Sequence, residues 1–179
     1  LTRYEYNNRI RDLTGVDFAL TDSLPSDGAG GEGFDTTGDS LFTSAIHFER
    51  YLAAANQVVE AILRDDEAAL TPELLGARER LLAPGRDSAT EEAAAEAIFS
   101  QLAARAFRRK IQADEQQRWL QWYREVRQRG QDHLAAVRSL LTAVLVSPHF
   151  LFVVEVEPEE EGVRQLNGYE LAARMALFI

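Results

Sequence analysis

The sequence predicts an all-α protein, a multi-helix bundle of about six to seven helices with one long Gly/Asp-rich loop. Alanine, leucine, glutamate and arginine dominate the 179 residues, and these residue types favour helices. Apolar residues recur three and four positions apart through much of the chain, which is the period of an amphipathic helix. Residues that commonly cap helices precede several of these apolar patterns.

The first helix is predicted over about residues 2–13. Thr2 and Glu5 have the spacing of a capping box, in which each side chain accepts a hydrogen bond from the other residue's backbone. Gly15 follows the last apolar position and suits the carboxyl end of a helix. The side chains expected to face the core are those of Tyr6, Ile10 and Leu13.

Two more helices are predicted before residue 90. Thr43 or Ser44 begins the second, which runs to about residue 63. Thr71 and Pro72 begin a short third helix, because proline suits a first helical turn, and Pro84-Gly85 ends it. The second helix is expected to turn a stripe of apolar residues inward: Phe48, Tyr51, Leu52, Ala55, Val59 and Ile62.

The later helices follow the same apolar period. They are expected over residues 88 or 90 to about 109, 114–129 and 132–147. Pro148 must stop the last of these, since proline cannot continue a helix. The residues from Phe150 to Val156 fit either a helical extension or a strand. Asn167 and Glu170 form a second capping box, which opens a final helix.

Changes in composition divide the chain into four parts. Residues 1–64 form an N-terminal helical domain with the Gly/Asp-rich loop, and residues 65–90 form a linker with a short helix. Residues 91–156 form a helical hairpin domain. Residues 157–179 are an acidic link and the start of a further domain, which we expect to continue beyond this chain.

The loop at residues 26–39 is the least ordinary stretch, because it contains five glycines. Ordering so many glycines costs much backbone entropy, which predicts an anchored loop with Phe34 buried. The loop offers oxygen ligands of the kind that calcium takes, namely Asp27, Glu32, Asp35 and Asp39. The competing interpretation is that Asp35 and Asp39 only cap turns and the entry to the next helix.

Charge and composition exclude several classes of protein. The formal net charge of −10 argues against a nucleic-acid-binding surface, which needs a basic patch. The most apolar stretch, residues 140–154, is too short to span a membrane, and we interpret it as a buried segment of the core. The chain has no cysteine, so it holds neither a disulfide nor a covalently attached haem.

Three groups of motifs carry a resemblance to known families. Residues 1–17, Leu24-Pro25 and residues 33–39 resemble a planctomycete-type domain of unknown function that occurs beside c-type cytochrome domains in large exported proteins. The motifs at residues 104–109 and 143–152 resemble a second domain of the same architecture. Residues 166–174 resemble the opening of a third.

The resemblance implies an exported protein, periplasmic or on the cell surface, with haem c on a neighbouring domain and no cofactor in this segment. The leading hypothesis is therefore a non-catalytic helical module that contacts other domains of the same longer chain. One alternative is part of an oxidoreductase active site that faces the neighbouring haem. Another is a calcium-dependent extracellular binding module.

His149 is the candidate cofactor-binding residue, because it follows Pro148 inside an apolar run. We expect its side chain to be mostly buried, either bonded to a backbone carbonyl in the core or in contact with a haem supplied by another domain. Four cations at the end of one helix are expected to pair with the protein's own carboxylates rather than with phosphate: Arg105, Arg108, Arg109 and Lys110.

Overall fold

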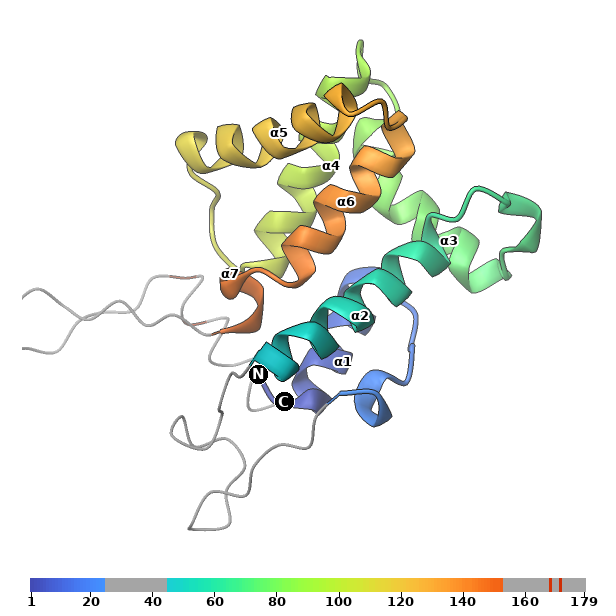
Figure 1. The fold of residues 1–179 in the computed structure, drawn as a ribbon, viewed down its shortest axis with the longest axis vertical. Coiled ribbons are helices and arrows are strands. Elements are labelled where there is room, and N and C mark those ends of the chain that lie inside the picture. Colours follow the sequence, from blue (N-terminus) through green and yellow to red (C-terminus); the bar gives the residue numbers. More distant parts are fainter. Residues whose placement is uncertain (25–44, 153–167, 169–170, 172–179) are drawn as a thin grey trace, which may run out of the picture.

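The computed structural model describes residues 1–24, 45–152, 168 and 171. Within these residues the chain is all-α, as predicted, and it forms seven α-helices without a strand. Figure 1 shows their arrangement. The helices are α1 (Arg3–Thr14), α2 (Ala45–Ile62), α3 (Pro72–Leu82), α4 (Glu91–Ala106), α5 (Ala113–Gln128), α6 (His133–Leu145) and α7 (Pro148–Leu151). The Gly/Asp-rich loop at 26–39 lies outside the described residues, as does the helix expected after Asn167 except for Gly168 and Leu171, which are both helical.

The helices pack in two groups that share α6. In one group, α4, α5 and α6 pack against each other, and in the other α2 packs on α6 and α3. Helix α1 contacts both α3 and α4, so it lies between the early and the late parts of the chain. The division of the chain at residues 64 and 90 stays a prediction. The described helices from both sides of it contribute to one hydrophobic core.

Local signals set the start and end of α1 as predicted. The Thr2 hydroxyl accepts a hydrogen bond from Glu5 N, and the Glu5 carboxylate accepts one from Thr2 N at 2.7 Å. Gly15 ends the helix with φ of 77°, a left-handed conformation that suits glycine because it has no Cβ. The predicted stripe of Tyr6, Ile10 and Leu13 is buried.

Helix α2 only partly follows the predicted stripe. Tyr51, Ala55, Val59 and Ile62 are buried as expected, but Phe48 and Leu52 are 43% and 38% exposed. Ala54 and Val58 are buried in addition. The buried face is therefore centred on positions three and four residues apart from Tyr51 onward. Leu52 lies on the flank of this face, and Phe48 lies in the first turn, before the face begins.

The ends of α4 and α6 explain how α7 arises. Helix α4 ends at Ala106, earlier than residue 109, because Arg108 has a left-handed φ of 51° that no helix can continue through. Pro148 stays outside α6, as predicted. The structure adds that Pro148 opens the short helix α7, which Ser147 caps by accepting a hydrogen bond from Phe150 N.

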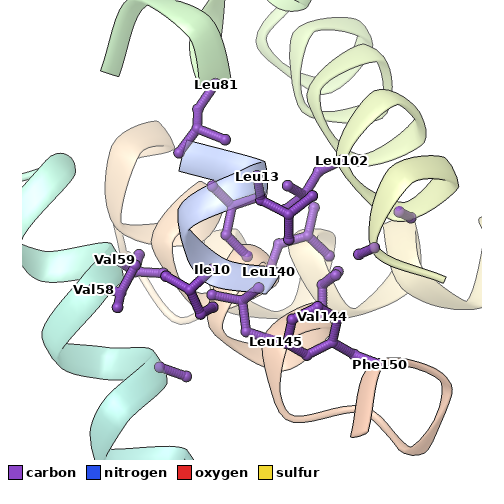
Figure 2. Packing of buried hydrophobic residues seen from close by; sticks show 14 of the residues in the cluster. Ile10, Leu13, Val58, Val59, Leu81, Leu102, Leu140, Val144, Leu145 and Phe150 are labelled. Atoms are coloured by element: carbon purple, nitrogen blue, oxygen red, sulfur yellow. The ribbon is translucent and has the colours of Figure 1, made fainter. Parts of the chain in front are cut away.

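The core lies where α1 meets α2, α4, α6 and α7. Figure 2 shows Ile10 and Leu13 of α1 among side chains from each of these helices. Burial of an apolar side chain of this size stabilises the fold by about 1.5–3 kcal/mol. Helix α1 is therefore held mainly by residues distant in sequence, among them Val58, Leu102, Leu140, Val144 and Phe150.

Candidate functional site

The motifs singled out from the sequence come together at one place in the fold. The second half of α1, the end of α4 and α7 meet beside the core, although they are about 40 to 140 residues apart in sequence. Phe150 lies at this junction, 1% exposed, with its ring edge-on to Tyr6 at 5.6 Å between ring centroids. The junction thus unites the N-terminal motif with the two later ones.

Arg9 joins α1 to α7. Its side chain is 7% exposed, its Nη1 donates a hydrogen bond to the Phe150 carbonyl at 2.5 Å, and its guanidinium lies 5.6 Å from the Phe150 ring centroid. Burial lowers the pKa of Arg9 to about 10, with a further lowering from the charge of Arg108 and an opposing effect of Glu5. Arg9 remains a cation at neutral pH, held in a largely desolvated position.

Arg105 joins α4 to the carboxyl end of α1. Its Nη2 donates to the Asp12 carbonyl at 2.6 Å, and its Nη1 lies 3.5 Å from the Leu13 carbonyl. Both carbonyls are in the last turn of α1, where they have no acceptor role within the helix. A cation at this end also complements the helix dipole.

Arg109, Glu115 and His149 form a neighbouring polar group. Arg109 and Glu115 make a bidentate ion pair with N–O distances of 2.8 and 2.7 Å. The hydrogen bond from Arg109 is the main reason that the pKa of the Glu115 carboxyl lies below its usual range. His149 Nε2 lies 3.6 Å from the same carboxylate, and its ring centroid is 5.3 Å from that of Phe107. The expected pairing of arginine with the protein's own carboxylates is thus confirmed for Arg109. It is wrong for Arg105, which donates to main-chain carbonyls instead.

The expectation that His149 is mostly buried is wrong, because its side chain is 44% exposed. The apolar run around it folds as a short helix rather than as one continuous buried segment. Successive residues on a helix point about 100° apart, so α7 turns Phe150 and Leu151 into the core and leaves His149 outside. Contact of His149 with a cofactor stays a prediction.

The four candidate calcium ligands, Asp27, Glu32, Asp35 and Asp39, all lie outside the described residues, as does Phe34. Calcium binding and anchoring of the loop therefore stay predictions. In residues 1–24 and 45–152, no group of three or more His, Asp or Glu side chains is placed to hold a metal ion. Across the same ranges, no helix has the length and apolar character needed to cross a membrane.

Sequence reasoning missed Arg9 and Glu115, although both carry a detectable signal. Arg9 follows Tyr6 by three residues and precedes Leu13 by four, so it occupies a position on the apolar face of α1. Glu115 precedes Trp119 by four residues, on the face of α5 that also carries Tyr123. A charged residue on an apolar helix face indicates a buried polar contact.

A cleft of about 260 Å³ opens at the same junction. It is lined by three arginines, one carboxylate and an apolar floor: Arg9, Asp12, Leu13, Arg105, Ala106, Arg108 and Phe150. The cleft lies between helix α1 and the end of α4, which the sequence places in different domains.

Replacing Glu115 by glutamine is expected to lower the free energy of unfolding by about 1–2 kcal/mol near neutral pH, because a hydrogen-bonded carboxylate is lost. The folded-state pKa of Glu115 is depressed, so its contribution is present above the unfolded pKa of about 4.3 and is lost as pH falls. The difference in free energy of unfolding between native protein and variant, measured with urea, should therefore decrease from about pH 6 to about pH 3. The control Asp114→Asn, at the exposed Asp114–Arg118 pair, should change stability much less. A difference in free energy of unfolding for Glu115→Gln that does not change with pH would contradict the prediction.

Two segments of the chain match family models. Residues 1–64 match PSD3, a protein of unknown function (DUF1587), and residues 94–155 match PSD5, a protein of unknown function (DUF1595). No curated protein and no solved structure matches the chain. The resemblance to domains of unknown function is therefore confirmed, and each half of the junction described above falls in a different matched segment.

Proposed function

We propose that this chain is a non-catalytic helical module of an exported, cytochrome-c-associated multidomain protein, periplasmic or on the cell surface. In this proposal the module contacts other domains of the same longer chain, and haem c is bound by one of those domains. The resemblance of residues 1–17, 104–109 and 143–152 to domains that accompany c-type cytochromes supports the association. A redox role would belong to the whole protein rather than to this segment.

The observation that carries the proposal is that two arginines of the motifs donate hydrogen bonds to main-chain carbonyls of distant helices. Arg9 donates to the Phe150 carbonyl, and Arg105 donates to the carbonyls of Asp12 and Leu13. In each of these bonds, an arginine side chain of one matched segment donates to a main-chain carbonyl of the other segment. Arginines whose donors are bound to backbone carbonyls fasten helices together, which is a structural role. Residues of the motifs that define the resemblance therefore hold helices of the module together.

A second candidate is part of an oxidoreductase active site, in which His149 contacts a haem on a neighbouring domain. The observation that favours it is the exposed position of His149 beside the Glu115 carboxylate. A carboxylate next to an imidazole can orient the ring, as it does for histidines that bind metals.

Two variants of the longer, haem-containing protein separate these proposals. His149→Ala is expected to leave the visible absorption spectrum and the reduction potential of the haem unchanged. Arg105→Met is expected to lower the melting temperature of the module, because it frees the carbonyls at the end of α1. A shift of the haem potential in His149→Ala with unchanged melting temperature would overturn the non-catalytic proposal.

Contact with other domains is tested by amide hydrogen exchange. The module within the longer protein should show slower exchange over part of its surface than the 179-residue chain shows alone. Identical exchange across the whole module in both forms would contradict the proposed contacts.

A further inference from the structure

Tyr123 and His133 join helix α5 to the start of α6. The Tyr123 hydroxyl oxygen lies 2.8 Å from His133 Nδ1, and the two rings meet edge-on with 5.9 Å between their centroids. Tyr123 is 2% exposed, and His133 is half-buried. In the part of the chain that the structure describes, this is the one hydrogen bond of the Tyr123 hydroxyl. The pair therefore connects α5 and α6 close to the turn between them.

This hydrogen bond assigns the protonation state of His133. The phenol has one hydrogen to donate, and His133 Nδ1 is the acceptor within reach. Nδ1 must therefore carry no hydrogen, so the ring is neutral with its hydrogen on Nε2. Protonation adds a hydrogen to Nδ1, which can then no longer accept. The Tyr123 hydrogen is left without an acceptor among the described residues, and this is unfavourable for a group with little exposed surface.

The surroundings of His133 also favour the neutral ring. Burial is the main reason that the pKa of His133 lies below its usual value. Glu91 and Arg127 act on the ring in opposite directions and form an ion pair with each other. His133 is also the first residue of α6, where the helix dipole disfavours a cation. The charged groups that face the pair come from α4, α5 and the N-cap of α6: Glu91, Glu92, Arg127 and Asp132.

We propose that the Tyr123–His133 pair is an acid-sensitive link, in which protonation of His133 releases the start of α6 from α5. The folded chain favours the neutral ring more than the unfolded chain does. The stabilisation is therefore present above the unfolded value for histidine, about pH 6.5, and is lost as the pH falls below it. Carboxylates ordinarily titrate near pH 4, so this response is separable from theirs. The link goes beyond the proposed module function and does not depend on it.

The first test is NMR titration of the His133 side chain in the 179-residue chain. Its titration midpoint should lie below that of the same residue in the urea-unfolded chain. Tyr123→Phe removes the hydrogen bond that only the neutral ring accepts, so the midpoint should rise towards the unfolded value. A native midpoint at or above the unfolded value would overturn the proposal, as would a midpoint that Tyr123→Phe leaves unchanged.

His133→Asn tests the link without removing the acceptor, because asparagine Oδ1 accepts a hydrogen bond and does not titrate. The urea midpoint of the native chain should decrease from about pH 7.5 to about pH 5.5. His133→Asn should remove about half of that decrease or more. The control His149→Asn changes an exposed histidine and should keep the decrease. The proposal is wrong if His133→Asn keeps the full decrease or if both variants remove it equally.

Amide hydrogen exchange shows whether the release is confined to the start of α6. Ala136 and Val137 are buried near the start of this helix, and Ala103 is buried in α4. Exchange of the two α6 amides, expressed relative to Ala103 in the same sample, should be faster at about pH 5.5 than at about pH 7.5. His133→Asn should abolish this change. A ratio that does not depend on pH in the native chain, or that changes equally in the variant, would contradict a local release.

Discussion

Replacing Phe150 by alanine is expected to lower the free energy of unfolding by about 3–5 kcal/mol, as for other large aromatic residues removed from a core. Phe150 is 1% exposed and packs against the Tyr6 ring. The main-chain carbonyl that accepts from Arg9 is kept in the variant, so the loss reports the contacts of the Phe150 ring, including its contact with the Arg9 guanidinium. Because single domains are typically stable by only about 5–15 kcal/mol, urea unfolding followed by tryptophan fluorescence should show a much lower midpoint.

Phe152 offers a matched control two residues away. Its side chain is 41% exposed, so Phe152→Ala should change stability by no more than about 0.5 kcal/mol. Similar losses for the two variants would mean that α7 is not fixed to the core through Phe150.

Replacing Gly85 by alanine is expected to destabilise the protein by about 1–3 kcal/mol, the usual cost of overpacking. Gly85 is buried, at the end of a 3-10 turn over Ala83–Gly85 that packs on α4. A Cβ placed there would lie 2.9 Å from the Ala94 carbonyl oxygen and 3.1 Å from Ala94 Cα. These are main-chain atoms of a helix, which cannot rotate away as a side chain would. Thermal unfolding and urea unfolding measure the loss.

The same substitution at Gly76 is expected to change the stability in the opposite direction. It lies inside α3, and a Cβ there would meet no atom within 4 Å. Gly76→Ala should therefore stabilise the protein by about 0.5–1 kcal/mol, because alanine loses less backbone entropy in a helix. Stabilisation by Gly85→Ala as well would show that α4 and the turn are not in close contact.

The helices were largely predictable because their ends carry local signals. Thr2 with Glu5, Thr71 with Pro72, and Asp132 each begin a helix in the structure where the sequence places one. These signals act over three or four residues, so a single sequence contains them fully. The end of α4 was missed, because arginine at residue 108 carries no general preference for the left-handed backbone that it adopts.

The site was less predictable, because it depends on contacts between distant residues. The exposure of His149 follows from the direction of α7 against the core, which the apolar run around it does not encode. The cleft requires α1 and the end of α4 to be neighbours, and no local pattern gives that contact. The resemblance located the motifs correctly without indicating that they meet.

The contact between α1 and α7 also has a consequence for how the chain folds. Leu1 N donates to the Leu151 carbonyl, and Arg9 to that of Phe150, so these bonds close loops of about 150 and 141 residues. Closing such loops costs chain entropy before any contact compensates it, which slows folding. Helices α4, α5 and α6 are joined by short connections and can assemble first. We therefore expect docking of α1 to be a late step. During synthesis, the apolar face of α1 can be fully covered only after residues 148–151 have been made.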